Sequence, residues 1–173
     1  MASSSSASTS YSPPPWDIFI NHRGPDVKKT FASYLYRRLI DRSLRVFLDK
    51  EELEAGQNIP SQIQQAILGA SLHIAIFSPT YAQSTWCLDE LVLMVESVKS
   101  GKIILPVFYK VQPSVLRHTV KDGAYAYALR KLKGKTAHDP ETGEEKPRHN
   151  PDSFRKWRDA LSFVADISGF VIL

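Results

Sequence analysis

The fold is decided by the stretch LHIAIFSPTYAQSTWCLDEL, residues 72–91, which has the pattern of a strand followed by a helix. Its first six residues are nearly all apolar, and Ser78-Pro79 interrupts them, as is typical of a strand that is buried on both faces. After this break, an apolar stripe recurs at helical spacing. It consists of Leu88, Leu91, Val92 and Val95. The stretch therefore predicts a buried strand and an amphipathic helix that covers it.

Short apolar segments alternate with helical patterns on both sides of this stretch. Further strands are expected at 16–21, 44–48 and 102–109, and helices at 26–42, 60–70, 84–101, 125–132 and 152–164. Asp26 and Asp152 are the expected caps of the first and last helices, and 134–150 is the expected long exposed loop. Because the strands are too apolar to be wet on one face, the pattern predicts an α/β fold. Its parallel sheet would carry helices on both faces.

The composition suits one folded domain. The chain has 173 residues, which is enough for a single core, and its 43% of hydrophobic and 23% of charged residues are ordinary for a globular protein. The formal charge of +4 permits an anionic partner without demanding nucleic acid. The basic helix at 26–42 carries no base-reading motif, so nucleic acid is not an expected partner.

The sequence also narrows the cellular setting. A single cysteine excludes an internal disulfide and a multi-cysteine zinc site, which favours a reducing, cytoplasmic or nuclear environment. No apolar run approaches the roughly 20 residues that a membrane helix needs, so no membrane span is expected. Residues 1–15 carry no charge and end in three prolines, and they are expected to form a disordered tail rather than a signal peptide.

Polar residues follow the predicted strands, and in a parallel sheet these carboxyl ends share one edge. The residues are Asn21-His22-Arg23, Asp49, Ser78 and Tyr109. Ligands of such sheets bind in the crevice outside the carboxyl ends of the strands. The segments after the first and third strands should therefore approach each other. Arg23 and Gly24 would then lie towards Trp86 and Glu90, although they are far apart in sequence.

The helix after residue 84 places an aromatic ring, a thiol and a carboxylate together. Trp86 and Glu90 are four residues apart, and Cys87 and Glu90 are three apart, so their side chains share one face. A tryptophan can stack on a flat cationic ring, and a carboxylate can stabilise an oxocarbenium-like transition state as that ring leaves. Taken alone, the pair is better explained by a tryptophan that anchors the helix and by a solvated glutamate.

Other kinds of site are absent or less favoured. Arg23 beside Gly24 could hold a phosphate or pair with a local acid. Cys87 is an auxiliary candidate because thiols at helix starts can be reactive, although a small buried cysteine is the commoner case. The acidic segment 49–54 fits a solvated loop better than a metal site. Common nucleotide, metalloprotease and hydrolase motifs are missing, and a phospho-receiver site would need an aspartate at Ser78.

Six segments, in order, resemble a Toll/interleukin receptor (TIR) domain of the plant type. They are DIFINHRGPD at 17–26, FLDKEELEAG at 47–56, FSPTYA at 77–82, WCLDEL at 86–91, LPVFY at 105–109 and KWRDAL at 156–161. Any one of these matches is weak, whereas six of them at the family's spacing are specific. The resemblance covers residues 16–170, which are expected to form the TIR domain.

The resemblance implies a flavodoxin-like fold with about five parallel strands. It also implies cleavage of NAD at the nicotinamide–ribose bond, which releases nicotinamide and ADP-ribose or a cyclic ADP-ribose-type product. Glu90 would be at the catalytic position and Trp86 at the ring-stacking position. The implied substrate-binding residues are His22, Arg23, Gly24, Asp26, Asp49, Ile59, Ser78 and Trp86. NAD is then the substrate, and neither a cofactor nor a metal is expected. In this family, self-association with other TIR domains assembles the site, and the products act as immune signals in plants.

Departures from the family pattern leave a second function open. The usual Ser-Phe-Arg-Gly-Glu-Asp is NHRGPD here, so His22 replaces an aromatic wall of the pocket. Ala55 replaces a basic residue in the loop 49–59, which gates the site and touches a neighbour in the family. Ser33-Tyr34 replaces the Ser-His pair of a helix interface. Since catalytic positions are kept while assembly positions change, the alternative is a non-catalytic adaptor that binds other TIR domains in defence signalling.

Overall fold

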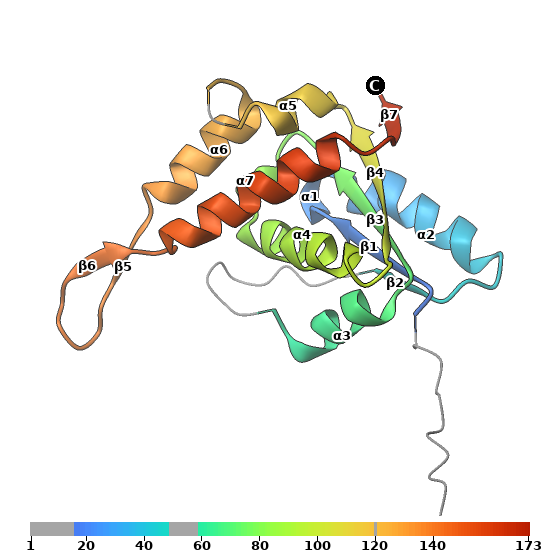
Figure 1. The fold of residues 1–173 in the computed structure, drawn as a ribbon, viewed down its shortest axis with the longest axis horizontal. Helices are drawn as coiled ribbons and strands as arrows, with labels where there is room; N and C mark the ends of the chain where they lie inside the picture. Colours follow the sequence, from blue (N-terminus) through green and yellow to red (C-terminus); the bar gives the residue numbers. More distant parts are fainter. Residues whose placement is uncertain (1–15, 49–58, 120) are drawn as a thin grey trace, which may run out of the picture.

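The structure is a computed structural model that describes residues 16–48, 59–119 and 121–173. Its helices and strands alternate along the chain, as the apolar pattern predicts (Figure 1). In chain order they are β1 (Ile18–His22), α1 (Gly24–Val27), η1 (Lys28–Ala32), α2 (Ser33–Ile40), β2 (Val46–Leu48), α3 (Ser61–Gly69), β3 (Leu72–Phe77), η2 (Tyr81–Gln83), α4 (Thr85–Val98), β4 (Ile103–Tyr109), α5 (Pro113–Arg117), α6 (Ala124–Lys133), β5 (Thr136–His138), β6 (Glu145–Pro147), α7 (Pro151–Ala165) and β7 (Phe170–Ile172).

Five parallel strands form one sheet in the order β2-β1-β3-β4-β7. Its centre is the β1–β3 pair, which runs in register from Ile18↔Leu72 to His22↔Ile76. The expected α/β fold, with a parallel sheet between helices, is confirmed. All four strands that the apolar pattern predicts are present. The fifth, β7, pairs through only three residues of β4, which is too short a segment for the pattern to reveal.

Side chains of the strands alternate between two cores, one on each face of the sheet. On one face, Phe19, Ala75 and Phe77 pack in a cluster with residues of α3, α4, α5, α6 and α7. On the other face, Ile20 and Ile76 pack with residues of α1, η1 and α2. Because successive residues of a strand point to opposite faces, β1 and β3 are buried at nearly every position. Burial on both faces holds β1 and β3 in this register, so their carboxyl ends lie side by side.

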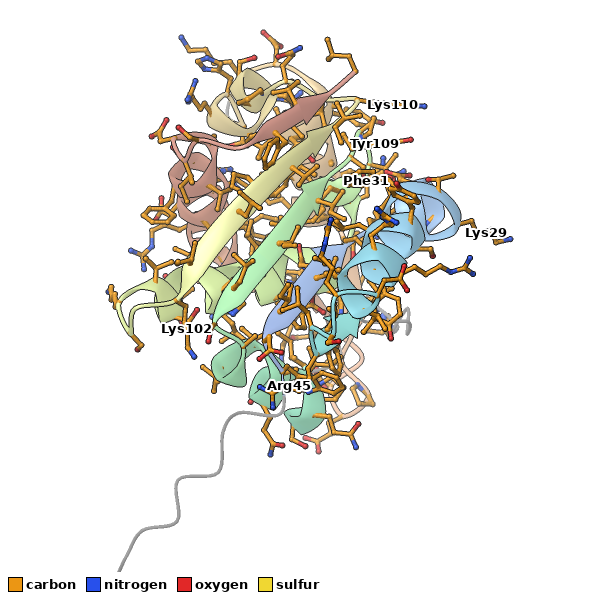
Figure 2. The ribbon with its side chains drawn as sticks, turned by 90° about the vertical axis from the view of Figure 1, so that its right-hand side faces the viewer. Lys29, Phe31, Arg45, Lys102, Tyr109 and Lys110 are labelled. Carbon is orange, nitrogen blue, oxygen red and sulfur yellow. The ribbon has the colours of Figure 1, made fainter. Side chains whose placement is uncertain are left out.

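The face under α2 is covered unevenly (Figure 2). Phe31 of η1 stacks on Tyr109 at the end of β4, with ring centroids 5.7 Å apart. Farther towards the β4–β7 edge, Ile103 and Phe170 are 63% and 61% exposed. The sheet is therefore more enclosed on the β1–β3 side, where the predicted site residues lie.

The two expected helix caps are wrong. Asp26 lies inside α1, and its carboxylate accepts hydrogen bonds from Ser78 and Thr80 in the turn after β3. The cap of α7 is Asn150, whose side-chain oxygen accepts from the backbone N–H of Asp152 at 3.0 Å. Pro151 then occupies the first helical turn, where its missing N–H does no harm. Asp26 is thus bound to residues 52 and 54 positions along the chain, which spacing does not reveal.

Two further segments differ from their expected local structure. The helix expected at 26–42 is divided into α1, the π-helical turn η1 and α2. The loop expected at 134–150 contains the antiparallel pair β5–β6, whose residues are all exposed and so carry no apolar alternation. Across 16–48, 59–119 and 121–173, no helix combines the length and apolar character needed to cross a membrane.

Candidate active site

The helix α4 starts at a capped turn beside the end of β1. The Ser84 side chain accepts a hydrogen bond from the backbone N–H of Cys87 at 3.3 Å, which satisfies one of the donors that every helix start exposes. The first two turns of α4 bury Trp86, Cys87 and Glu90. Hydrogen bonds then join Cys87 and Glu90 to the end of β1. The segments after the first and third strands therefore meet, as the topology predicts.

Glu90 lies in a buried polar cluster with Asn21. The glutamate is 2% exposed, and its Oε2 accepts a hydrogen bond from the side-chain nitrogen of Asn21 at 2.7 Å. Asn21 is fully buried near the end of β1, and the same nitrogen lies 3.4 Å from the carbonyl oxygen of Cys87. A carboxylate removed from water needs donated hydrogen bonds to offset its lost hydration. The Asn21 amide supplies one.

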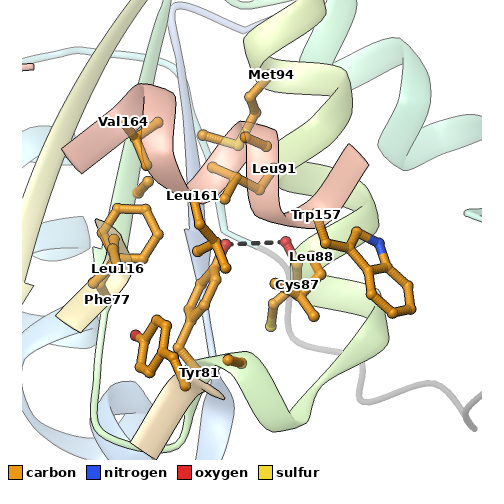
Figure 3. Close-up of a cluster of buried hydrophobic side chains, with 14 of the residues drawn as sticks. Phe77, Tyr81, Cys87, Leu88, Leu91, Met94, Leu116, Trp157, Leu161 and Val164 are labelled. Atoms are coloured by element: carbon orange, nitrogen blue, oxygen red, sulfur yellow. Dashed lines mark hydrogen bonds between the residues drawn. The ribbon is translucent and has the colours of Figure 1, made fainter. Parts of the chain in front are cut away.

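The hydroxyl of Tyr81 completes this cluster from the short η2 turn. It donates to Oδ1 of Asn21 at 2.5 Å and lies 3.0 Å from the Cys87 carbonyl oxygen, the contact drawn in Figure 3. Burial, with a smaller contribution from Cys87 and Glu90, raises the pKa of Tyr81 well above its ordinary value. The hydroxyl therefore keeps its proton and remains a donor. We name Asn21, Tyr81, Glu90 and the Cys87 carbonyl the enclosed cluster.

A second polar cluster, nearer the surface, joins the β1–α1 turn to the β3–η2 turn. Asp26 accepts from the Ser78 hydroxyl at 2.5 Å, the Thr80 hydroxyl at 2.5 Å and the Thr80 N–H at 3.2 Å. Arg23 donates to the Thr80 hydroxyl oxygen, and its Nη1 lies 3.8 Å from Asp26 Oδ1. The Arg23 and Asp26 side chains are 24% and 18% exposed. We name Arg23, Asp26, Ser78 and Thr80 the open cluster.

The charge of Asp26 is stabilised within the open cluster. Burial alone would raise the pKa of Asp26. The hydrogen bonds from Ser78 and Thr80, together with the nearby Arg23, outweigh this and hold the pKa below its ordinary value. Asp26 is therefore a carboxylate at neutral pH, and it ties the two turns together.

Trp86 and Cys87 are largely core residues. Trp86 is 8% exposed and belongs to the cluster packed between the sheet and α3–α7. Cys87 is also buried, and its thiol donates to the backbone carbonyl of His22 at 3.4 Å. Reactive thiols usually lie in partly exposed, electropositive places. The contacts of Cys87 thus favour packing, and its auxiliary role stays a prediction.

The remaining predicted site residues lie at the same edge of the sheet or outside the described residues. His22 ends β1, and Gly24 opens α1. Ile59 is partly buried against the core on the α3 side. Asp49 belongs to the segment 49–58, which lies outside the described residues. The roles predicted for these positions stay predictions.

Three polar residues of the two clusters, Asn21, Thr80 and Tyr81, were assigned no role from the sequence. Asn21 carried a visible signal, because it is a polar residue that ends an apolar strand at the predicted ligand-binding edge. Tyr81 carried none, since a buried tyrosine resembles any core aromatic and lies 60 positions from the asparagine that it binds. Thr80 was visible only as part of a turn after Pro79.

A pocket of 260 Å³ lies beside the open cluster. Its lining is mainly apolar and comes from the turn after β3, the β4–α5 segment, the start of α6 and the last residue: Pro79, Lys110, Val111, Gln112, Val115, Ala124, Tyr125 and Leu173. The Tyr125 hydroxyl connects this pocket to the sheet edge by donating to the Ser78 carbonyl at 2.7 Å. In the described part of the chain, no group of three or more His, Cys, Asp or Glu side chains could hold a metal ion.

The two clusters offer complementary chemistry. The enclosed cluster presents one carboxylate where screening by water is weak, so it can stabilise a positive charge that develops nearby. The open cluster presents a guanidinium, which carries several N–H donors suited to phosphate oxygens. A ligand with a cationic centre at one end and phosphate at the other would match both.

Comparison with known proteins identifies one family. The TIR domain model matches residues 15–172. The chain is 36% identical over 171 residues to TMV resistance protein N of Nicotiana glutinosa, a match that covers 98% of this chain and 13% of that protein. It is 45% identical over 101 residues to the probable 2' cyclic ADP-D-ribose synthase BdTIR of Brachypodium distachyon, covering 58% of this chain and 44% of that protein. The chain therefore spans less than half of either relative.

A solved structure has the same architecture. It is that of the TIR domains of the activated Roq1 resistosome, which directly recognises the pathogen effector XopQ. The TM-score is 0.73 at 36% sequence identity, and the match covers 90% of this chain and 87% of that one. Likeness of fold and of sequence thus extends over nearly the whole described chain.

Proposed function

Because the chain belongs to the TIR domain family, we propose that it cleaves NAD at the nicotinamide–ribose bond, with Glu90 as the catalytic residue. The observation that carries this proposal is the Glu90 carboxylate, which is 2% exposed and held by the Asn21 amide at 2.7 Å. The likeness to a protein named as a probable 2' cyclic ADP-D-ribose synthase supports NAD as the substrate. ADP-ribose is the part of NAD that remains when nicotinamide leaves.

The reaction breaks the bond between ribose C1′ and the ring nitrogen of nicotinamide. Both bonding electrons move to that nitrogen, so the cationic ring leaves as neutral nicotinamide without needing a proton. The ribose is left with an oxocarbenium-like positive charge, which the Glu90 carboxylate stabilises. Water, or a hydroxyl group of the same ADP-ribose, then adds to C1′ and releases one proton.

Trp86 and Arg23 are proposed to bind different parts of the substrate. Trp86 lies one turn before Glu90, where its indole would stack on a flat ring. Arg23 already donates to Thr80. A guanidinium carries several N–H donors, so the same side chain can also donate to a phosphate oxygen. The other proposed substrate contacts are His22, Gly24, Asp26, Asp49, Ile59 and Ser78.

Release of nicotinamide from NAD by the purified chain tests this proposal. We expect release by the wild-type chain and a loss of at least about 100-fold in Glu90→Ala. The matched control is Asp89→Asn, on the same helix, because asparagine keeps an oxygen to accept the Trp157 indole N–H, now bound at 2.7 Å. Equal release by wild type and Glu90→Ala, or none from wild type at any concentration, would contradict the proposal.

We also propose that self-association raises the activity and that the products serve immune signalling in the cytoplasm or nucleus. Similarity to TMV resistance protein N and to the resistosome TIR domains supports both statements. Turnover per molecule should then rise steeply with protein concentration. A flat dependence would leave a site that is complete within one chain.

One observation favours a second candidate, a non-catalytic adaptor that binds other TIR domains. Glu90 and Trp86 are 2% and 8% exposed, so a substrate would reach them only after the sheet edge opens. An adaptor needs no such opening. It predicts that binding to a second copy of the chain survives Glu90→Ala and that NAD is not turned over. Sedimentation analysis of both variants, run beside the NAD assay, separates the two functions.

A further inference from the structure

The side-chain amide of Asn21 is hydrogen-bonded at both ends inside the enclosed cluster. Its nitrogen donates to Glu90 Oε2 at 2.7 Å, and its oxygen accepts from the Tyr81 hydroxyl at 2.5 Å. We infer that Asn21 and Tyr81 are positioning residues that fix the Glu90 carboxylate for NAD cleavage. This inference rests on the proposed function and names what holds its catalytic group.

The partners of Asn21 allow only one orientation of its amide. The nitrogen faces two acceptors, Glu90 Oε2 and the Cys87 carbonyl, whereas the oxygen faces the Tyr81 hydroxyl. Turning the amide over would place its oxygen against the Glu90 carboxylate, with no proton between two acceptors. Tyr81 therefore determines which end of Asn21 faces Glu90, although we find it bonded to Asn21 and the Cys87 carbonyl rather than to the glutamate.

Burial makes these bonds difficult to replace. Asn21 and Tyr81 are fully buried and Glu90 is 2% exposed, so bulk water does not readily take the place of a lost partner. A carboxylate without its donor would turn about its side-chain torsions towards another partner. Since electrostatic stabilisation of a transition state depends on orientation fixed in advance, such a turn lowers the rate of the chemical step.

The ring of Tyr81 packs among other buried side chains of the core (Figure 3). It packs edge-on against Phe77, with centroids 4.8 Å apart, and stacks on Tyr125 at 6.4 Å with an angle of 12° between the rings. Phe77 ends the central strand β3, so the hydroxyl is anchored to the most buried part of the sheet. A continuous series of contacts therefore connects Phe77 of β3 to Tyr81, Tyr81 to Asn21 and Asn21 to Glu90.

Tyr81→Phe is the main test, because it removes one oxygen and keeps the packed ring. In the full chain we expect kcat for nicotinamide release to fall about 10-fold, with KM changing less than about twofold. Asn21→Leu keeps the approximate shape of the side chain but removes both bonds, and kcat should fall about 100-fold.

Tyr125→Phe is the matched control. Tyr125 is also fully buried and stacks on Tyr81, and its hydroxyl also donates to a backbone carbonyl, that of Ser78 at 2.7 Å. Removal of this hydroxyl should lower thermal stability about as much as Tyr81→Phe does, while kcat stays within about twofold of wild type. Equal kcat losses in the two tyrosine variants, or an effect of Tyr81→Phe on KM alone, would overturn the inference.

A second measurement separates this inference from the proposed function. In nuclear magnetic resonance spectra of the isotope-labelled chain, the side-chain amide signals of Asn21 should move in both Glu90→Gln and Tyr81→Phe but not in Tyr125→Phe. If wild type does not cleave NAD, the proposed function fails while these shifts still show whether the support exists. If the Asn21 side-chain amide signals do not move in Tyr81→Phe, the positioning role is refuted, whether or not the chain cleaves NAD.

Discussion

The enclosed cluster and the open cluster lie at the same edge of the sheet, yet they differ in the charge and the burial of their side chains. The enclosed cluster surrounds one carboxylate, Glu90, with a neutral amide and a neutral hydroxyl that are fully buried. The open cluster sets Asp26 against a cation, Arg23, and both side chains remain partly exposed. One cluster thus orients a buried carboxylate with neutral groups, and the other neutralises a charge while joining two turns.

This difference separates two kinds of role. A buried carboxylate is costly to keep away from water, and its hydrogen bond to Asn21 holds it in one orientation beside β1, which is consistent with a chemical role. A shared network of hydroxyl, backbone N–H and guanidinium stabilises the turns it connects and leaves cationic donors near the surface. We therefore expect changes in the enclosed cluster to affect turnover, and changes in the open cluster to affect stability and substrate binding.

Glu90→Gln should give the largest effect, and it tests whether the carboxylate of the enclosed cluster has a chemical role. It keeps the shape of the side chain and removes the charge, so NAD turnover should fall by at least about 100-fold. Thermal unfolding should occur near the wild-type temperature, because a neutral amide costs less to bury than a carboxylate and its oxygen can still accept from Asn21. A stable variant with wild-type turnover would show that the enclosed carboxylate is only structural.

Asp26→Ala should show the opposite balance. The carboxylate accepts hydrogen bonds from the hydroxyl groups of Ser78 and Thr80 and from the Thr80 N–H, and their loss should lower the free energy of unfolding by about 1.5–3 kcal/mol. Urea denaturation measures this. A decrease in turnover as large as that of Glu90→Gln, without a change in stability, would remove the distinction between the clusters.

The pH dependence of the free energy of unfolding should also show the contribution of the Asp26 carboxylate. The pKa of Asp26 lies below its ordinary value of 3.8 in the folded protein, because hydrogen bonds from Ser78 and Thr80 outweigh the effect of burial. Its contribution is therefore fully present above the unfolded-state pKa and is lost as pH falls through the folded-state value. Between neutral pH and strongly acidic pH, wild type should lose more stability than Asp26→Ala, as followed by unfolding at several pH values.

Arg23→Lys should sharpen the binding role of the open cluster. Lysine keeps the positive charge but lacks the planar fork of donors, so it should bind Thr80 and a phosphate oxygen together less well. KM for NAD should rise about 3- to 10-fold with a smaller change in kcat. Initial rates over a range of NAD concentrations distinguish this result from a loss of kcat alone, which would assign Arg23 to the chemistry instead.

The ion pair of Asp17 and Arg45, away from both clusters, should give the smallest effect. Hydrogen bonds from Arg45 lower the pKa of Asp17 to about 2, so the pair persists until pH falls through that value. Because both groups face solvent, Arg45→Ala should leave turnover within about twofold of wild type and barely move the unfolding midpoint. A large loss of turnover would mean that the base of β1 communicates with its carboxyl end.

The layers of the fold could be predicted from the sequence because burial leaves a periodic record. The run from Leu72 to Phe77 is apolar except for His73, and the stripe through Leu88 and Leu91 repeats at helical spacing, so β3 and α4 followed directly. β7 and the β5–β6 pair left no such record, since the first pairs through three residues and the second is exposed on both faces. The cap expected at Asp26 failed for a related reason, because its partners lie far along the chain.

The site was predictable where topology alone determines neighbours. The carboxyl ends of adjacent parallel strands meet, so the approach of the β1 end to the start of α4 followed from strand order. Which side chains bond there did not follow. The link from Tyr81 to Asn21 spans 60 positions, and that from Asn21 to Glu90 spans 69, and neither has a spacing rule. The Thr80 partner of Arg23 was likewise a matter of three-dimensional contact.

The catalytic role of Glu90 is tested most directly by nicotinamide release from NAD, measured for wild type and Glu90→Gln over a range of protein concentrations. We predict release by wild type that rises more steeply than the concentration of the chain. Glu90→Gln should stay at least about 100-fold slower at every concentration. Equal rates for the two proteins, or no release by a folded and self-associated wild type, would contradict the claim that the enclosed carboxylate cleaves NAD.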